Sequence, residues 1–490
     1  MAQKDIIGLI LAAGGILGGI IAATISKRLR DVFFTAMIVL APMTEDWDVN
    51  FVSRDFYRGT TRGFEFSLVD ILSISLLASA ILAPRKDQSR GFWPASFGLM
   101  LLFFCYACFN VAMADPKLFG LFELSKMLRG LTIFLAVAFF VRTERELKLF
   151  VFALGVIVSY EGLVALQQRY YYGINRVPGT VDDSNSLSVF FCTTAPIFVA
   201  AINAKLPKFL KGLGAIAIAL SCVGVILTIS RAGVVILGLI LLGAALTTMS
   251  WRLTPKKIIC TILVIAGVAG MLGKSWKTLQ SRFNETNLEA EYGNKKNLGR
   301  GYYIRVAVAI AEDQMFGVGL NNWSYWVSQK YGPKLGYRFV KYRGTDTEPS
   351  TVIPPGSNVD EAQAAPAHSL GALTAGELGI PGLVLFAFLW MRWFQMALSF
   401  LWPRTPEPMR RMGVGILFGL SGLFLQSLTE WVFRHSPIYY TAHILLGVLA
   451  SLYWLKRREK RQQKAVAEAA YQENFAPVGT VPHLSGVSTG

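Results

Sequence analysis

The sequence predicts an all-α polytopic membrane protein with about 12 to 13 transmembrane helices, because its composition, its long apolar runs and the spacing of its basic residues all favour that class. Hydrophobic residues make up 53% of the 490 residues and charged residues only 16%, against roughly 25% charged residues in a soluble domain. The mean hydropathy is +0.44. This composition excludes a soluble cytosolic enzyme, a disordered chain and a disulfide-rich secreted module.

Thirteen runs are apolar enough to be interpreted as membrane spans, each approaching the length of about 20 residues that crosses a bilayer. They lie near residues 5–25, 31–43, 64–83, 92–114, 117–141, 147–166, 185–202, 209–229, 231–249, 256–273, 369–390, 413–429 and 438–455. The run 31–43 is short and ends at Pro42, so we interpret it as a tilted or half-inserted helix.

The basic residues predict the orientation of these spans. If successive connections alternate between the two sides, one side and the C-terminal tail carry 25 of the 48 Lys and Arg residues, whereas the short connections of the other side carry 9 with the N-terminus. Basic short loops stay in the cytoplasm, which predicts an outer N-terminus and a cytoplasmic C-terminus. The net charge of +17 therefore indicates membrane topology rather than nucleic-acid binding, which would need a basic face with interleaved aromatic residues.

The spans and loops divide the chain into four predicted regions: N-terminal transmembrane helices (1–273), one large outer loop (274–367), C-terminal transmembrane helices (368–455) and a cytoplasmic tail (456–490). A loop of this length is more than a connection, so we expect function there. We also expect an amphipathic helix from Arg305 to Phe316 within it.

Three arginines near the outer boundary could bind an anion. Arg231 lies between two apolar runs, while Arg300 and Arg305 lie in the large loop. A guanidinium offers two parallel donors that match a phosphate. Arg231 can instead be a boundary arginine that extends its charge into water, and Arg300 and Arg305 can each be a solvated charge of the loop. Arg300 and Arg305 are five residues apart, about 140° around a helix, so they need not face the same site.

His368 is the candidate base, at the end of the large loop where the next span begins. A single histidine is more often structural than catalytic. Here it lies on the same predicted side as the three arginines, and an imidazole can accept a proton from a hydroxyl near neutral pH.

Other polar residues permit more than one interpretation. Glu123, Lys126 and Arg129 share one face of their span, and either a functional cluster or a neutralised structural one is compatible with that spacing. Asp70 is a similar intramembrane charge without an evident partner.

Asp182 and Asp183, ahead of Asn185, predict a turn that caps the next helix. The five cysteines lie in apolar runs, so no disulfide framework or metal site is predicted.

Four short motifs occur in order along the chain. They are Gly179-Thr180 through Asn185, Ser230-Arg231-Ala232-Gly233, Gly299-Arg300 through Gly317-Val318-Gly319 and Asn322, and His368-Ser369 followed after nine residues by Gly379-Ile380-Pro381-Gly382. With them, the sequence resembles the O-antigen ligase/O-antigen polymerase superfamily of bacterial envelope glycosyltransferases over about residues 160–450. Ser369, Gly379, Gly382 and Asn185 support the resemblance as motif positions.

The resemblance implies a helical inner-membrane enzyme of the GT-C kind. Such enzymes move a glycan from undecaprenyl pyrophosphate to an acceptor hydroxyl on the periplasmic side. It implies that His368 activates the acceptor, that Arg231 and Arg300 hold the pyrophosphate, and that Arg305 joins them. It also implies metal-independent chemistry with no cofactor, and membrane lipids as surroundings.

The motifs do not distinguish between three classes of acceptor. A ligase to a lipid, a chain polymerase and a transferase to protein hydroxyls share these motifs. Two departures bear on the acceptor: Gln314-Met315-Phe316 replaces the more usual His-Pro-Leu type of sequence, and residues 338–366 form a longer segment than in many relatives. The alternative of a different class is a transporter or flippase of lipid-linked oligosaccharides.

Overall fold

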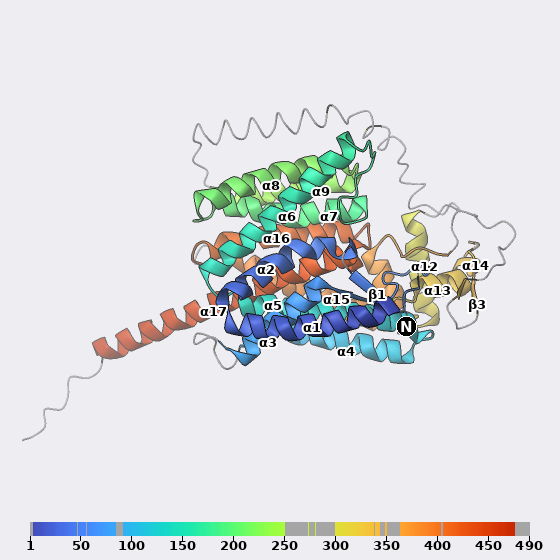
Figure 1. The fold of residues 1–490 in the computed structure, drawn as a ribbon, viewed down its shortest axis with the longest axis horizontal. Coiled ribbons are helices and arrows are strands. Elements are labelled where there is room, and N and C mark those ends of the chain that lie inside the picture. The colour runs from blue at the N-terminus through green and yellow to red at the C-terminus, as the bar shows by residue number, and fades with distance from the viewer. Residues whose placement is uncertain are drawn as a thin grey trace, which may run out of the picture.

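The computed structural model describes residues 3–475, except for 47, 55, 85–91, 250–298 apart from 273 and 280, 338, 344–347, 350–362 and 403–404. Helices make up 77% of these described residues, which confirms the all-α class. The helices run roughly parallel to one long direction (Figure 1). We call the end that carries α12, α13 and α14 the loop end, and the opposite end, from which the last part of α17 projects, the tail end.

The described residues of the first half of the chain form nine α-helices, one short 3-10 helix and a small hairpin. In order, the elements are α1 (Gln3–Ile25), α2 (Lys27–Leu40), η1 (Ala41–Asp46), β1 (Asp48–Phe51), β2 (Phe64–Ser67), α3 (Leu68–Leu82), α4 (Phe97–Met113), α5 (Lys117–Phe140), α6 (Glu144–Tyr170), α7 (Ser184–Asn203), α8 (Lys208–Leu227) and α9 (Arg231–Thr248).

The second half supplies the loop-end elements and the last long helices. They are α12 (Arg300–Asp313), α13 (Trp323–Trp326), η2 (Val327–Tyr331), α14 (Gly332–Lys334), β3 (Tyr342–Arg343), β4 (Glu348–Pro349), α15 (Leu370–Leu398), η3 (Ser399–Leu401), α16 (Met409–Ser427), η4 (Val432–Arg434) and α17 (Ser436–Phe475).

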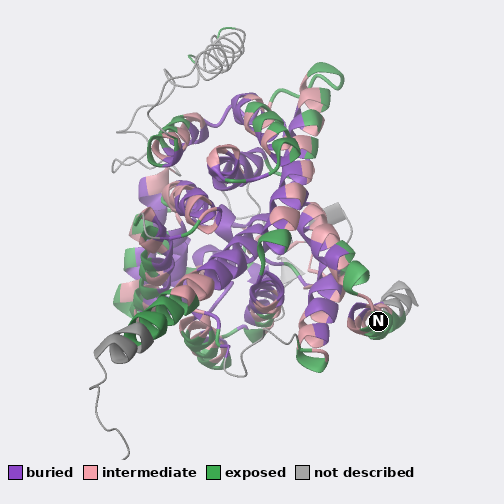
Figure 2. Ribbon diagram, turned by 90° about the vertical axis from the view of Figure 1, so that its left-hand side faces the viewer, coloured by how far each residue is buried: buried purple, intermediate pink, exposed green. Residues whose placement is uncertain are grey.

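Six of the described helices are long and apolar enough to cross a membrane, namely α6, α7, α8, α9, α15 and α17, and shorter apolar helices occur in α1, α3 and α4. The protein is therefore a polytopic membrane protein. The spans of α7 and α17 are 83% buried, whereas that of α9 is 33% buried. Hence α7 and α17 form the centre and α9 the rim, and Figure 2 shows the buried segments gathered in the middle of the end-on helices.

Twelve of the predicted runs overlap α1–α9 and α15–α17, and the run 256–273 lies outside the described residues. The run predicted from residue 64 is wrong at its start. Residues Phe64–Ser67 form a strand that pairs antiparallel with Asp48–Phe51. The helix begins only at Leu68, because the Asp70 carboxylate accepts from the backbone N–H of Ser67 at 2.7 Å and closes a capping box.

The amphipathic helix of the large loop exists, but its predicted bounds are wrong. It runs from Arg300 to Asp313 instead of from Arg305 to Phe316. The chain leaves the helix in a turn closed by the N–H of Gly317 bonding to the carbonyl of Gln314 at 2.9 Å, with Gly317 at φ +79°. Glycine adopts that conformation without steric cost, so the helix ends before Phe316.

Candidate active site

His368 lies directly before the N-cap of α15. Ser369 is that N-cap, and its hydroxyl accepts from the backbone N–H of Ala372 at 3.4 Å. The Nδ1 atom of His368 is 2.7 Å from Oε2 of Glu430, which lies between α16 and η4. The Glu430 side chain is 12% exposed and that of His368 39%. The carboxylate is thus held inside the fold while the imidazole remains open to solvent.

The second oxygen of Glu430 gathers two more of the predicted site residues. Its Oε1 lies 3.4 Å from Nη2 of Arg300, at the start of α12, and 3.4 Å from Nδ2 of Asn185, near the start of α7. Arg300 also donates through Nε to the carbonyl of Thr429 at 3.3 Å. One carboxylate therefore joins the first turns of α7, α12 and α15, three segments far apart in the sequence.

A further arginine, Arg176, links this group to the turn that carries Arg231. It donates to the Asn185 side-chain oxygen at 2.9 Å and to the Thr228 carbonyl at 3.3 Å. Three residues after Thr228, Arg231 is the first residue of α9, half-buried, next to the N-cap Ser230, which accepts from the N–H of Gly233 at 3.3 Å. Polar contacts therefore connect Arg176 to Arg300 through Asn185 and Glu430, and Arg231 lies three residues after Thr228, which Arg176 contacts.

Arg305 takes a different direction from Arg300. Its guanidinium donates to the hydroxyl of Tyr337 at 3.3 Å, and the ring of Tyr337 lies 4.2 Å from that of Tyr302. This agrees with the expectation that residues five apart on one helix need not face a common site. This contact directs the Arg305 guanidinium toward the Tyr302–Tyr337 pair.

Residues 216–387 match the sequence family described as O-antigen ligase. This part of the chain is similar to O-antigen ligases. The matched range includes Arg231, Arg300, Arg305 and His368, whereas Glu430 lies beyond it. No curated protein matches the chain. The family supports a glycosyl-transferring membrane enzyme with a lipid-linked glycan and an acceptor as its partners.

The glycines of the last motif connect the large loop to α15. Gly379 interrupts α15 at φ +68°, and a Cβ there would lie 2.1 Å from the carbonyl oxygen of Met315. The backbone N–H groups of Val318 and Gly319 donate at 2.9 Å to the carbonyls of Gly376 and Glu377. These N–H groups are used by the protein, so the Gly317–Gly319 turn is a structural joint rather than a phosphate loop.

Gly382 allows a second close approach. A Cβ at this position would lie 2.3 Å from Cβ of Leu378 and 2.9 Å from the ring of Tyr106 on α4. The hydroxyl of Tyr106 donates to the Leu378 carbonyl at 2.6 Å, which that close packing permits. The spacing from His368 to Gly379 therefore determines how far along α15 the break lies from the histidine, and Gly382 allows close packing just after the break.

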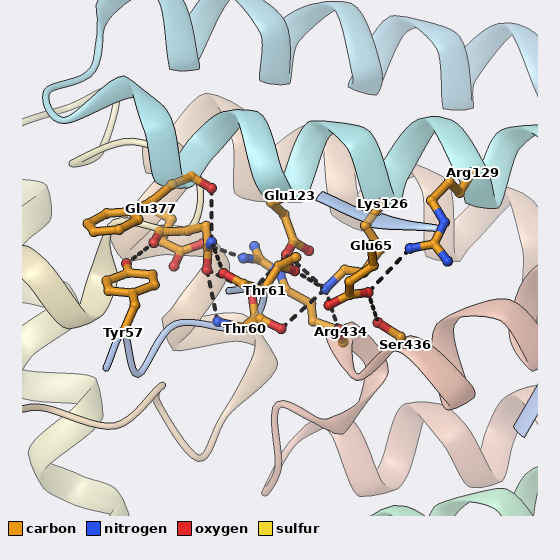
Figure 3. A network of polar contacts seen from close by, with 12 residues as sticks. Tyr57, Thr60, Thr61, Glu65, Glu123, Lys126, Arg129, Glu377, Arg434 and Ser436 are labelled. Carbon is orange, nitrogen blue, oxygen red and sulfur yellow. Dashed lines mark hydrogen bonds and ion pairs between the residues drawn. The ribbon is translucent and has the colours of Figure 1, made fainter. Parts of the chain in front are cut away.

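A buried polar network includes Arg434, four residues after Glu430, and Figure 3 shows its residues from the 57–65 segment, α5, α15, η4 and the start of α17. Arg434 pairs with Glu377 of α15, with side chains 7% and 1% exposed. Lys126 of α5 donates to the backbone carbonyl of Arg434 at 2.6 Å and pairs with Glu123 at 2.8 Å. Because Arg434 follows Glu430 by four residues, these contacts anchor the segment that presents Glu430 to His368.

Glu123, Lys126 and Arg129 of α5 all form ion pairs. This agrees with the interpretation of that span as a neutralised structural cluster. Arg129 donates to Asp70 at 2.8 Å and to Glu65 at 3.2 Å. The prediction that Asp70 has no partner is therefore wrong, because β2 and the first turn of α3 bring Ser67, Glu65 and Asp70 to one arginine. Their pairing favours a structural role for this cluster.

The segment that carries Tyr57 packs into the same network. The hydroxyl of Tyr57 donates to the carbonyl of Asn321, and its ring stacks on Phe119 at 3.5 Å between ring centres. Complete burial, with a further contribution from neighbouring Tyr342, raises the pKa of Tyr57 well above its usual range. This phenol therefore remains a neutral hydrogen-bond donor and has no evident acid–base role.

Glu430 and Arg176 were missed by the sequence argument. Glu430 follows the run 413–429 in the segment Thr429-Glu430-Trp431, and an acidic residue at the end of an apolar run was the available signal. Its contact with His368 spans 62 positions, so no local spacing could reveal it. The cap predicted before Asn185 is confirmed, since Asp183 accepts from the N–H of Ser186 at 2.8 Å.

Proposed function

We propose that this chain is a glycosyltransferase that moves a glycan from undecaprenyl pyrophosphate to an acceptor hydroxyl at the periplasmic face of the bacterial inner membrane. In this orientation the N-terminus is periplasmic and the C-terminus cytoplasmic. The observation that carries the proposal is the pairing of His368 with Glu430 at 2.7 Å, with Arg300 on the same carboxylate. One titratable base and a phosphate-binding cation thus meet at one place.

His368 would act as the general base. With Glu430 accepting the proton of Nδ1, the opposite ring nitrogen is oriented to take the proton of the acceptor hydroxyl. The acceptor oxygen forms a bond to the first carbon of the donor sugar as the bond from that carbon to the pyrophosphate oxygen breaks. The electron pair leaves with the lipid pyrophosphate, and Glu430 stabilises the imidazolium that forms.

Arg231 and Arg300 would hold the pyrophosphate and stabilise the charge that develops on it. Arg176 is well placed to assist, since it connects the Arg231 turn to Asn185 and through Asn185 to Glu430. In this proposal the guanidinium groups provide the charge stabilisation that a metal ion gives in other transferases. Chelation by EDTA should then leave the rate unchanged.

The acceptor can be a second lipid-linked glycan, a lipid or a protein hydroxyl. A polymerase would leave longer glycans on the lipid, whereas a ligase would transfer the glycan to an added lipid or peptide. The two activities need the same base and the same cations. Analysis of the products therefore distinguishes a polymerase from a ligase, whereas the identity of the catalytic residues does not.

The test uses the purified full chain in nanodiscs with an undecaprenyl-pyrophosphate glycan and EDTA. Release of lipid pyrophosphate and the mass of the glycan product are measured for wild type, His368→Ala and a control, His483→Ala in the C-terminal tail. Loss of a general base should lower turnover by about 10² to 10⁴-fold, with the control unchanged. Full turnover by His368→Ala would refute the base, and lipid movement across the membrane without release would favour a flippase.

A further inference from the structure

A buried carboxylate of α6 holds the first motif, Gly179-Thr180. The Glu161 side chain is fully buried, and its Oε2 accepts from the backbone N–H of Thr180 at 3.0 Å. The Thr180 hydroxyl donates to Oε1 of the same carboxylate. An ionisable residue within a membrane-spanning helix is costly and usually has a functional reason, yet no step of the proposed transfer uses Glu161.

Gly179 permits the close approach of this carboxylate. Its φ is +68°, and a Cβ there would lie 2.6 Å from Oε2 of Glu161, which real Cβ atoms do not tolerate. Seven residues after Glu161, Gln168 exchanges two hydrogen bonds with Gly179, since its Nε2 donates to the Gly179 carbonyl and its Oε1 accepts from the Gly179 N–H, both at 2.9 Å. Residues seven apart lie on one face of a helix, so one face of α6 holds both Gly179 and Thr180.

The segment that α6 holds in this way begins with Arg176 and ends with Asn185. Arg176 is half-buried and already ordered, because its Nη2 donates to Oδ1 of Asn185 at 2.9 Å and its Nε donates to the Thr228 carbonyl at 3.3 Å. No hydrogen bond joins Nη1 of Arg176 to any residue that the structure describes. The guanidinium therefore keeps donors for an anion beside the carboxylate of Glu430, which Asn185 contacts at 3.4 Å.

We propose that Glu161 is a positioning residue that acts through Arg176. By holding Gly179 and Thr180, it fixes the 176–185 segment so that the Arg176 guanidinium is in place for the pyrophosphate of the lipid-linked donor. This inference rests on the proposed transfer reaction. An arginine that is ordered before the anion arrives loses less conformational entropy on binding, and its free donors match phosphate oxygens.

The mutational test changes the acceptor and then one of its donors. Glu161→Gln keeps the shape of the side chain but has one acceptor oxygen where two donors bind, so kcat/KM for the glycan donor should fall by at least about fivefold, with KM for the acceptor unchanged. Thr180→Val should lower the same constant, whereas Thr180→Ser keeps the hydroxyl and should retain it. The Thr180 pair decides the matter if Glu161→Gln does not fold. The matched control is Glu144→Gln, at an exposed position of the same helix, which should behave like wild type.

A double substitution distinguishes positioning from a purely structural role. Arg176→Gln alone should lower kcat/KM for the donor by about 10 to 150-fold. If Glu161 acts through Arg176, Glu161→Gln should have no further effect in the Arg176→Gln background, because residues that act as one unit are not additive. Independent, multiplicative effects of the two substitutions would overturn the proposal and leave Glu161 a structural carboxylate.

A binding measurement separates this proposal from the transfer reaction. Farnesyl pyrophosphate, a short polyisoprenoid pyrophosphate without a glycan, is titrated into wild type and the variants in nanodiscs. Its Kd should rise by at least about fivefold in Glu161→Gln and by about 10 to 150-fold in Arg176→Gln, with Glu144→Gln unchanged. Equal affinity of wild type and Glu161→Gln, or no binding by wild type, would overturn the proposal. The expected differences in Kd without any transfer by wild type would retain the role of Glu161 and reject the transferase.

Discussion

Glu430→Gln is the substitution that most directly tests the proposed chemistry. Glutamine keeps the size of the side chain and an oxygen acceptor, but it removes the negative charge 2.7 Å from Nδ1 of His368. The same change removes the ion pair with Arg300 at 3.4 Å. The imidazolium formed during transfer would then lose its counter-charge, while the arginine would keep its own charge for the pyrophosphate.

The size of the effect follows from the geometry. At 2.7 Å, two unit charges attract by about 6 kcal/mol for an effective dielectric constant of 20. Hydrogen bonds to charged groups contribute only about 1.5 to 3 kcal/mol net of their solvation. If that net contribution is realised in the transition state, kcat falls by about 10 to 150-fold. KM for the donor should not rise, because Arg300 loses a competing partner.

The assay is the release of lipid pyrophosphate in nanodiscs under saturating and limiting donor, which separates kcat from KM. Glu312→Gln, a substitution at an exposed position of α12, is the matched control and should leave both constants unchanged. A kcat within about twofold of wild type for Glu430→Gln would refute the role of the carboxylate, since twofold corresponds to only about 0.4 kcal/mol.

Three further substitutions have definite expected results. Arg231→Lys keeps the charge but loses the two-donor fork, so kcat/KM for the donor should fall by about 10 to 150-fold; an unchanged value would assign Arg231 to the lipid boundary. Glu377→Ala leaves Arg434 buried without its carboxylate and should lower the free energy of unfolding by about 3 to 5 kcal/mol, seen as a lower Tm in detergent. Hydrogen bonding from Lys330 holds the pKa of Asp313 below its usual range, so this contact stabilises the end of α12 above about pH 4 and is lost as the pH falls further. Proteolysis at this position should therefore increase in acid for wild type, and Asp313→Asn should be equally sensitive at neutral and acid pH.

The helices were largely predictable because hydropathy alone determines which segments can cross a bilayer. The overlap of the predicted runs with α3–α9 and α15–α17 reflects that constraint. The start of α3 was not predictable in the same way. Phe64–Ser67 is apolar enough to extend a span, and only its pairing with Asp48–Phe51 makes it a strand.

The candidate site was predictable only in part, and for a physical reason. His368 and Arg300 were found from short motifs, while Glu430 and Arg176 act through contacts made by distant segments. Glu430 reaches His368 across 62 positions and Arg300 across 130. Such contacts depend on how α7, α12, α15 and α16 pack, which a single sequence does not contain in its spacing.

The break at Gly379 divides α15 into two mechanical parts. The upper part, which begins at His368, is fastened to the 315–319 segment by backbone hydrogen bonds, and α12 packs against α15. The lower part, together with α16, lines a long apolar groove. A change in the bend at Gly379 would therefore move His368 and Arg300 together, relative to the part of α15 that follows Gly379.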